Sequence, residues 1–500
     1  MGTHRIACVL AAGLALISSA RASSQAVPGS AMSMRDTRYL FLDLAEIDRL
    51  EGVVHSVNPG EKHPLNPVLM GTPGEWDHPR VKFYGTVMHE PESGLWKMWY
   101  SGTEDQPAGL GMTALTDSRH IGYATSRDGI RWDKPKLGIV EYLGRKDNNL
   151  VLLDGQAANV FDLRGKVPGK RYRMYVESFG ENGAANFRWL RSEDGVHWDE
   201  EGRVSQEALP IELANVLYDP DDPNPAHRWK AYTLLMDMNF PARKLGVITS
   251  PDGKTWTQPI TLLDPRDGLE DENHYLGVTR YHDYYVALYD FMYRNHSTAT
   301  ALAVSRDGIK FTRVLNGQFL LGPGDTGDFD SSMPVIGQGF LTVYGKHYLY
   351  YTGSDKNYQE GSSRSGLGLP WRRQIALATW RQDGFTDMRV AEGGERGWLM
   401  TQPIRVADSG SFELWVNANV PGPGNDLTVE IVDGQSLKPL AGYERSRSLS
   451  GVNSLEHVVA WPSARDLAGV RSPTVRLRFT LQGTQARLYA FGFREQRSSR

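Results

Sequence analysis

Runs of alternating hydrophobic and polar residues recur along most of the chain. The most regular runs are rich in aromatic residues and occupy residues 97–102, 172–176, 229–233, 283–288 and 347–351. A second apolar run precedes each of them, at residues 81–87, 159–163, 215–218, 275–281 and 333–341. A period of two residues is typical of a β-strand with one buried face. The pattern therefore predicts pairs of strands at roughly regular intervals.

A turn sequence follows each aromatic run. Four clear copies read Ser-x-Asp-Gly-x-x-aromatic, at residues 126–132, 192–198, 250–256 and 305–311, and a degenerate fifth lies at residues 381–385. An Asp-Gly pair readily adopts the positive φ angles of a tight hairpin. Each copy is therefore expected to join two further antiparallel strands, which makes four strands in each repeat.

Five repeats of four strands predict five sheets arranged around an axis. The predicted fold is a five-bladed β-propeller over residues 37–390. After about residue 390 the repeat stops, and alternating runs follow between turn residues, at residues 401–406, 412–416, 427–432, 456–461, 475–479 and 486–491. This pattern predicts a C-terminal β-sandwich over residues 395–496. The fold class is thus all-β.

The first residues of the chain form a different kind of segment. Arg5 precedes an apolar run at residues 6–17, and Ala20-Arg21-Ala22 places small residues where a signal peptidase cleaves. We expect residues 1–22 to be a signal peptide and the protein to be secreted or periplasmic. A membrane anchor is the alternative, but the run is shorter than the ~20 apolar residues that span a bilayer. No membrane span is expected.

Composition and charge narrow the possible functions. Of the 500 residues 40% are hydrophobic and 23% are charged, and the formal net charge is −4 without long basic runs. Such a charge pattern argues against a nucleic-acid partner. The single cysteine, Cys8, lies inside the predicted signal peptide, which excludes a cysteine nucleophile, a disulfide or a thiolate metal site from the mature protein. We expect neither a metal nor another cofactor, and the sequence gives no oligomeric state.

Acidic residues precede the first strand of every predicted blade. In a propeller these first strands line the channel, so residues just before them meet at one mouth. Glycosidic cleavage needs two carboxyls there, one protonated to donate to the leaving oxygen and one ionised as nucleophile or base. Crowding of like charges raises the pKa of at least one carboxyl. The candidate catalytic residues are Asp77, Glu272, Glu212 and Asp330.

Other residues near these strand starts are candidates for holding a sugar. Trp76 could stack on a sugar ring, and an arginine could hold a carboxylate or sulfate through two hydrogen bonds. The alternative is structural, because Asp and Asn often satisfy loop amides and a tryptophan often packs in a core. The candidate substrate-binding residues are Trp76, Arg80, Asp154, Asn159, Asn215, Asp271, His274 and Arg294.

Several segments resemble the five-bladed propeller glycoside hydrolases related to invertases and fructanases and to arabinanases and xylosidases. They lie at residues 39–43, 66–69, 98–100, 122–126 and 148–151, and the resemblance to the family-32-like secreted bacterial proteins spans residues 37–495. It implies the propeller fold and a glycoside hydrolase activity. The chain lacks the Trp-Met-Asn-Asp-Pro-Asn and Glu-Cys motifs of invertases, so fructoside specificity is not implied, and Asp77 is at best a positional counterpart of their nucleophile.

We therefore expect a secreted glycoside hydrolase that cleaves a plant or algal oligosaccharide from a chain end. This hypothesis predicts that Asp77→Asn and Glu272→Gln abolish hydrolysis without lowering the melting temperature. A non-catalytic glycan-binding propeller is one alternative. A lyase acting on uronates is another, with His274 and Arg294 available to it. A sialidase-like enzyme is the third, although sialidases have six blades and one residue between Asp and Gly in the corresponding turns.

Overall fold

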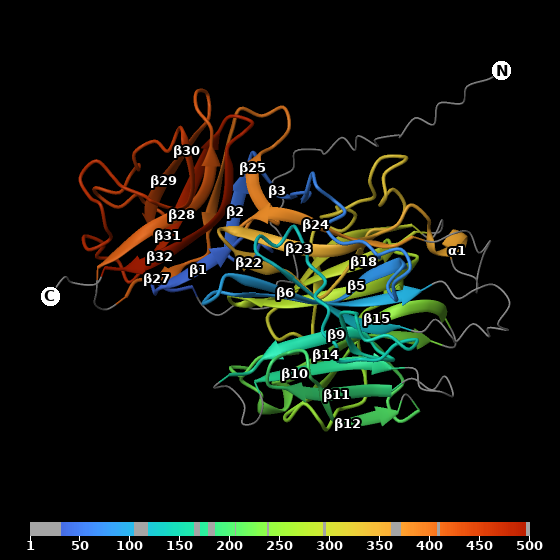
Figure 1. The fold of residues 1–500 in the computed structure, drawn as a ribbon. Coiled ribbons are helices and arrows are strands. Elements are labelled where there is room, and N and C mark those ends of the chain that lie inside the picture. Colours follow the sequence, from blue (N-terminus) through green and yellow to red (C-terminus); the bar gives the residue numbers. More distant parts are fainter. Residues whose placement is uncertain are drawn as a thin grey trace, which may run out of the picture.

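The computed structural model describes residues 32–104, 119–164, 171–178, 186–205, 207–237, 240–293, 297–361, 372–407 and 411–496. The expected signal peptide, residues 1–22, lies outside these ranges. Regular structure within them is almost entirely β-strand, with one helical turn, α1 (Tyr358–Gly361), and two 3-10 turns, η1 (Pro225–His227) and η2 (Pro265–Asp267). The prediction of an all-β chain is confirmed (Figure 1). No described helix is long and apolar enough to cross a membrane.

Four sheets in a row each consist of four consecutive antiparallel strands. Blade one contains β5 (Pro79–Glu90), β6 (Leu95–Glu104), β7 (His120–Ser126) and β8 (Leu150–Leu152). Blade two contains β9 (Gln156–Asp162), β10 (Tyr172–Ser178), β11 (Asn186–Ser192) and β12 (Asp199–Ser205). Blade three contains β13 (Glu212–Tyr218), β14 (Trp229–Asp237), β15 (Phe240–Ser250) and β16 (Ile260–Leu263). Blade four contains β17 (Glu272–Tyr281), β18 (Tyr284–Met292), β19 (Thr298–Ser305) and β20 (Thr312–Arg313).

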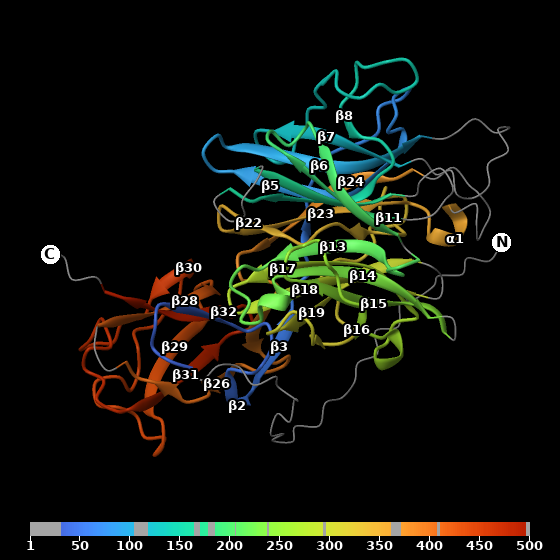
Figure 2. The ribbon, with the colours of Figure 1, turned by 90° about the horizontal axis from the view of Figure 1, so that it is seen from below.

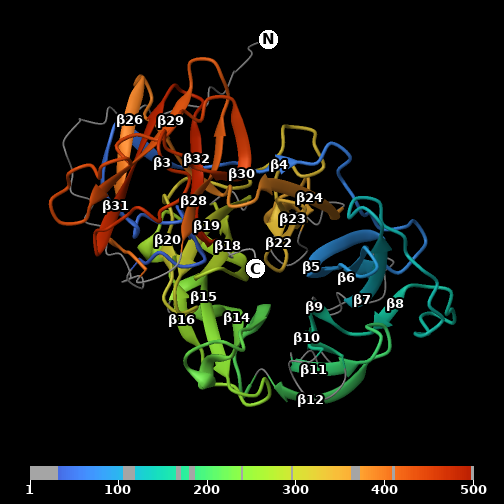
Figure 3. The ribbon, with the colours of Figure 1, turned by 90° about the vertical axis from the view of Figure 1, so that its left-hand side faces the viewer.

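The fifth blade closes the ring with a strand from the other end of the propeller. Its own strands are β21 (Val335–Ile336), β22 (Leu341–Val343), β23 (Lys346–Gly353) and β24 (Gln374–Arg381). Its outermost strand is β4 (Glu61–Lys62), in which Lys62 lies opposite Ala378. The sheets follow one another around a ring, so the predicted five-bladed propeller is confirmed (Figure 3). The degenerate fifth Asp-Gly turn makes no hairpin within its blade, because the chain leaves for the next domain after β24.

The four clear Asp-Gly turns share one hydrogen-bond pattern. In the turn at Asp252, the Ser250 hydroxyl accepts from the Gly253 amide at 2.9 Å, and the Asp252 carboxylate accepts from the amides of Lys254 and Thr255, each at 2.8 Å. Gly253 has φ +72°, a left-handed conformation that favours glycine. The sequence pattern thus acts locally, by satisfying the turn's own amides.

The same turns also join neighbouring blades. The Gly253 carbonyl of blade three accepts a hydrogen bond from the Tyr175 hydroxyl of blade two at 2.9 Å. The other three turns accept an equivalent hydrogen bond from an aromatic side chain on the second strand of the preceding blade. The donor and the glycine carbonyl that accepts are Trp99 and Gly195, Tyr232 and Gly308, and Tyr350 and Gly129. The aromatic runs and the turns are therefore two halves of one inter-blade contact.

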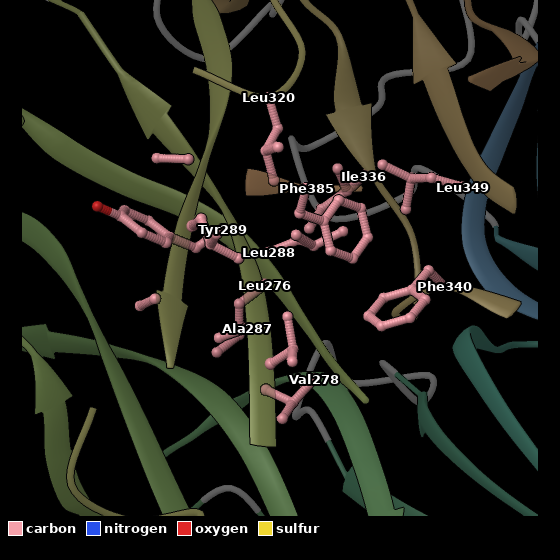
Figure 4. Close-up of a cluster of buried hydrophobic side chains, with 14 of the residues drawn as sticks. Leu276, Val278, Ala287, Leu288, Tyr289, Leu320, Ile336, Phe340, Leu349 and Phe385 are labelled. Carbon is pink, nitrogen blue, oxygen red and sulfur yellow. The ribbon is translucent and has the colours of Figure 1, made fainter. Parts of the chain in front are cut away.

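Apolar side chains fill the space between blades. In the largest cluster, Leu276 and Val278 of β17 and Leu288 of β18 meet Ile336 and Phe340 of blade five (Figure 4). All five are buried. Burial of this kind stabilises the ring, because each blade covers the apolar face of the next.

Two further sheets form the sandwich, which lies against the side of the propeller (Figures 1 and 2). One sheet contains β3 (Val53–Val57), β25 (Thr386–Val390), β32 (Arg487–Glu495), β28 (Phe412–Val420) and β30 (Val452–Val458), with β1 (Thr37–Leu40) beside β32. The other contains β2 (Ile47–Glu51), β26 (Arg396–Thr401), β31 (Thr474–Gln482), β29 (Asp426–Asp433) and β27 (Ile404–Arg405).

The N-terminal strands require a correction of the expected domain boundaries. The sequence predicts that residues 37–57 and 386–390 belong to the propeller, but β1, β2, β3 and β25 pair with sandwich strands. Tyr39 lies opposite Phe491, and both rings are buried in the sandwich core. The N-terminal segment thus completes the sandwich first and then supplies β4 to the propeller.

Candidate active site

Two tyrosines close the centre of the propeller. The rings of Tyr84 on β5 and Tyr275 on β17 stack with centroids 4.5 Å apart and planes at 10°. They belong to blades one and four, which are not neighbours in a ring of five, so the stack lies across the axis. The Tyr275 hydroxyl donates to the Ala214 carbonyl of blade three at 2.7 Å. The channel is filled at this level.

Two carboxylates meet one guanidinium near this stack. Glu212 begins β13 and Glu272 begins β17, and Arg243 on β15 approaches both, with Nε 3.8 Å from Glu212 Oε2 and Nη1 3.1 Å from Glu272 Oε1. Their side chains are 41% and 24% exposed, so both are accessible to a ligand. Burial opposes charge on Arg243, but the carboxylates of Glu212 and Glu272 outweigh it and raise the pKa of Arg243. Of the predicted site residues, the structure brings Glu212, Glu272 and His274 together.

A third carboxyl, Glu177, lies on β10 and is 3% exposed. The Gln156 side-chain amide donates to Glu177 Oε2 at 2.5 Å. Burial, followed by the charge of Glu212, raises the pKa of Glu177 to about 8. Glu177 therefore retains its proton at neutral pH.

His274 is buried and neutral. Its Nδ1 lies 3.2 Å from Arg243 Nη1. A guanidinium can only donate, so Nδ1 accepts and the ring hydrogen is on Nε2. Burial lowers the pKa of His274 well below its usual value, and the charges of Arg243, Arg373 and Lys82 add to this effect. His274 is therefore a hydrogen-bond donor and not a proton acceptor.

Three cations lie on the side of blades five and one. Arg80 and Lys82 are on β5, and Arg373 directly precedes β24. The backbones of Arg80 and Arg373 are bridged, and the Arg373 side chain hydrogen-bonds Tyr84. Burial lowers the pKa of Arg373, and the neighbouring charge of Arg80 lowers it further.

Asp77 and Asp330 have different surroundings from the central acids. Asp77 is 1% exposed and accepts from the Tyr100 hydroxyl at 2.8 Å and from Lys134 Nζ at 2.5 Å. Asp330 is 2% exposed and accepts from the Tyr351 hydroxyl at 2.7 Å, with Lys62 Nζ also at 2.7 Å. No described contact joins either aspartate to Glu212, Glu272 or Arg243.

Blade four repeats this arrangement. Glu270 accepts a hydrogen bond from Arg313 Nε at 2.8 Å and another from Tyr289. An acid before the first strand, a tyrosine on the second strand and a cation from an outer segment thus form a clamp in blades one, four and five. We interpret the recurring acids at these three positions as structural, because each clamp fixes the loop that leads into its blade.

The two predicted asparagines connect blades through hydrogen bonds. Asn159 Oδ1 accepts from the Val216 amide at 2.6 Å, and Asn215 Oδ1 accepts from the Val278 amide at 2.8 Å. Thr86 plays the same part between blades one and two, since its hydroxyl accepts from the Val160 amide at 2.9 Å. This set of contacts favours the structural interpretation of both asparagines.

The remaining predicted residues within the described ranges are Trp76, Asp154 and Asp271. Trp76 is buried in the core of blade one, where its Nε1 donates to Asn149 Oδ1 at 2.9 Å. Asp154 occupies a left-handed turn between β8 and β9, and Asp271 is exposed directly before β17. Arg294 lies outside the described residues.

Sequence reasoning missed Glu177, Arg243, Tyr84 and Arg373. Glu177 directly follows the strand predicted at residues 172–176, which is the one signal that it offers. Tyr84 lies within a predicted strand, and Arg243 and Arg373 lie outside every predicted strand. Within the described ranges, no group of three or more His, Asp or Glu side chains is placed to hold a metal ion.

Comparison with known proteins finds similarity in fold. No protein-family profile and no curated protein sequence matches the chain. Among solved structures, a β-1,2-mannobiose phosphorylase from Listeria innocua aligns over 66% of this chain and 98% of its own, with 13% identity and a TM-score of 0.46. An exo-β-1,3-galactanase from Phanerochaete chrysosporium aligns over 88% and 100%, with 11% identity and a TM-score of 0.36. An α-L-arabinofuranosidase from Podospora anserina aligns over 63% and 96%, with 14% identity and a TM-score of 0.40. A shared fold of this kind does not fix the reaction.

Proposed function

We propose that this protein is a secreted glycoside hydrolase that removes sugar from a chain end of a plant or algal oligosaccharide. The observation that supports it is the approach of Glu212 and Glu272 to the same guanidinium, Arg243, with Glu177 close enough to Glu212 for that charge to help raise its pKa. Secretion rests on the N-terminal segment of the sequence, residues 1–22.

The two chemical roles fall to different carboxyls. Glu212, the most exposed of the three, would donate the proton to the leaving glycosidic oxygen, because it is the carboxyl most open to a ligand and lies near the protonated Glu177. Glu272, paired with the Arg243 guanidinium at 3.1 Å, would act as nucleophile or base. Glu177 would be a positioning residue that keeps a proton available near neutral pH.

The filled channel supports action at a chain end. Because Tyr84 and Tyr275 stack across the axis, a glycan cannot thread through the propeller at this level. A sugar that reaches Glu212 and Glu272 from the mouth would therefore stop above Tyr84. This arrangement favours a terminal unit over the middle of a chain.

Elimination by a lyase is less well supported. A lyase needs a base to remove a proton from the sugar, and three candidates near the axis are Tyr84, Tyr275 and His274. Burial raises the pKa of both tyrosines, and Nδ1 of His274 already accepts from Arg243. None of the three side chains is suited to take up a proton.

The direct test is hydrolysis of a panel of plant and algal oligosaccharides by the purified protein and its variants. We expect Glu212→Gln and Glu272→Gln to lower the rate at least about 100-fold, the usual scale of acid-base catalysis. Glu207→Gln, on an exposed loop, is the matched control and should behave as wild type. Full activity in both site variants would refute the assignment, and glycan binding without any product would favour the non-catalytic alternative.

The pH profile tests the positioning role of Glu177. In the wild type, activity should fall as pH rises through about 8, where Glu177 loses its proton. In Glu177→Gln this alkaline limb should disappear, because the carboxyl that titrates there has been removed. An unchanged profile would contradict the role.

A further inference from the structure

Tyr358 connects blade five to the candidate active site. It lies in α1, between β23 and β24. Its ring meets the His274 ring at a steep angle, with centroids 5.7 Å apart, and the guanidinium carbon of Arg243 lies 5.8 Å from its centroid. The Tyr358 side chain also hydrogen-bonds Arg243. Because a guanidinium can only donate, the Tyr358 hydroxyl is the acceptor. A residue of blade five thus reaches a cation of blade three.

The sequence around Tyr358 fixes the start of α1. Asn357 and Glu360 form a capping box, in which Asn357 Oδ1 accepts from the Glu360 amide at 2.8 Å and Glu360 Oε2 accepts from the Asn357 amide at 3.0 Å. A single helical turn is marginal by itself, so these two hydrogen bonds stabilise it. Tyr358 directly follows the capping asparagine and packs, partly buried, against the largest hydrophobic cluster of the ring. The hydroxyl is therefore held in a defined place.

Arg243 has two kinds of partner. Glu212 and Glu272 are the carboxyls to which the proposed reaction assigns a chemical step. His274 and Tyr358 have no such step, and neither changes its charge during the reaction. An arginine side chain is long and flexible, so with carboxyl partners alone the guanidinium would follow whichever carboxyl carries more negative charge. The other two partners oppose that movement.

The proposed reaction moves negative charge past Arg243. Glu212 gives its proton to the glycosidic oxygen, which also receives the electron pair of the breaking bond, and Glu212 becomes a carboxylate. An oxygen of Glu272 forms the new bond to the anomeric carbon, or takes a proton from the attacking water, and Glu272 loses its charge. The total charge is unchanged, because Glu212 gains what Glu272 loses. A guanidinium fixed beside both carboxyls stabilises the charge before and after this step.

We propose that Tyr358 is a positioning residue, which holds the Arg243 guanidinium in place while negative charge passes from Glu272 to Glu212. This inference rests on the proposed hydrolase function of the same site. A preorganised cation needs no rearrangement when charge develops, whereas a mobile cation must reorient in each turnover. Tyr358 acts through Arg243 and has no contact of its own with the reacting atoms.

The kinetics of Tyr358→Phe on a cleaved oligosaccharide test the inference. The variant loses the hydroxyl but keeps the ring that meets His274. We expect kcat to fall about tenfold and KM to change less than about twofold, because a hydrogen bond to a charged group is lost. Tyr344→Phe, on the turn between β22 and β23, is the matched control, since Tyr344 is 74% exposed and its hydroxyl lies 3.2 Å from His89 Nε2. It should keep wild-type kinetics.

Two kinetic outcomes would overturn the inference. One is an unchanged kcat in Tyr358→Phe. The other is a higher KM with an unchanged kcat, which would indicate a direct contact between Tyr358 and the sugar.

A double-mutant cycle tests whether Tyr358 acts through Arg243. Arg243→Met removes the guanidinium, and in that background Tyr358→Phe should change kcat less than about twofold. If Arg243→Met fails to fold, Arg243→Lys replaces it, because lysine keeps the charge and loses the planar donors. Full additivity of the two losses in kcat would refute the proposed dependence on Arg243.

Crystal structures of the wild type and of Tyr358→Phe separate the inference from the hydrolase. We expect Arg243 to contact both Glu212 and Glu272 in the wild type and to turn toward one of them in the variant. An Arg243 that keeps its place in the variant would overturn the inference, even where oligosaccharides are cleaved. A displaced Arg243, in a protein whose wild type cleaves no oligosaccharide, would support the positioning by Tyr358 and refute the hydrolase.

Discussion

Acidic residues with similar places in sequence have two different environments in this protein. Asp77, Asp330 and Glu270 are enclosed by a tyrosine and a cation from their own blade. Glu212 and Glu272 begin their strands, face Arg243 and remain accessible. An acid that already has a tyrosine and a cation has little capacity to contact a substrate, so partners distinguish the two groups better than position does.

This difference makes a prediction about Asp77→Asn that opposes the one from sequence. Asp77 is buried and paired with Lys134, so the variant leaves a partly buried ammonium without its counter-charge. We expect a loss of about 3 kcal/mol in unfolding free energy and a lower thermal midpoint. Asp147→Asn, in an exposed ion pair with Arg145, is the control and should leave the thermal midpoint almost unchanged. An unchanged midpoint together with lost hydrolysis would restore Asp77 as a catalytic residue.

At the scale of elements, the Asp-Gly turn is the structural feature that recurs in blades one to four. The serine and aspartate satisfy the turn from within, and the glycine carbonyl receives an aromatic side chain from the preceding blade. Because one short segment makes both contacts, local sequence and blade packing are satisfied together. This double use of one segment accounts for the similarity among the four clear Asp-Gly turns.

Gly253→Ala, compared with a glycine that has no neighbour, should separate the contribution of the turn conformation from that of the contact with the preceding blade. A Cβ there would lie 2.2 Å from the Tyr175 hydroxyl, and the φ of +72° already disfavours alanine. We expect a loss of about 3 kcal/mol, the sum of left-handed strain and overpacking. Gly94→Ala, with φ +65° and no atom within 4 Å, should lose only about 1 kcal/mol. Equal losses in thermal or urea unfolding would show that the contact with Tyr175 contributes nothing.

On the scale of the whole molecule, the sandwich and the propeller share buried charges. Glu46, between β1 and β2, accepts from Arg306 of blade four at 2.6 Å and from the Tyr284 hydroxyl at 3.2 Å. Asp43 also accepts from Tyr284, at 2.9 Å. Burial and then the charge of Asp43 raise the pKa of Glu46 to about 7, against the opposing effect of Arg306. The junction therefore holds a proton that the unfolded chain would release.

The sign of the resulting pH dependence follows from linkage. A carboxyl with a pKa raised from 4.5 to about 7 contributes its full stability below pH 4.5, and this contribution is lost as pH rises through about 7. We expect the unfolding free energy of wild type, relative to Glu46→Gln, to fall by about 2 kcal/mol between pH 5 and pH 8. Thermal unfolding of both proteins across this range measures it. A difference that stays constant with pH would contradict the raised pKa.

The strand pattern, the Asp-Gly turns and their number were all readable in the sequence, because each depends on residues close together in the chain. The period of two shows which side chains are buried, and the Asp-Gly pair specifies its own turn. The all-β class, the five blades and the later sandwich follow from that local information.

Only the tertiary structure decided two things. These are the strands that complete the sandwich and the acids that lie near one another. Residues 37–57 look like a leading strand of the propeller, but their partners are strands more than 300 residues later, such as β32. Glu177, Arg243 and Arg373 come to the axis from three different blades. Their chemistry arises from distances between remote segments, so the sequence predicts that acids gather at a mouth and the fold determines which ones do.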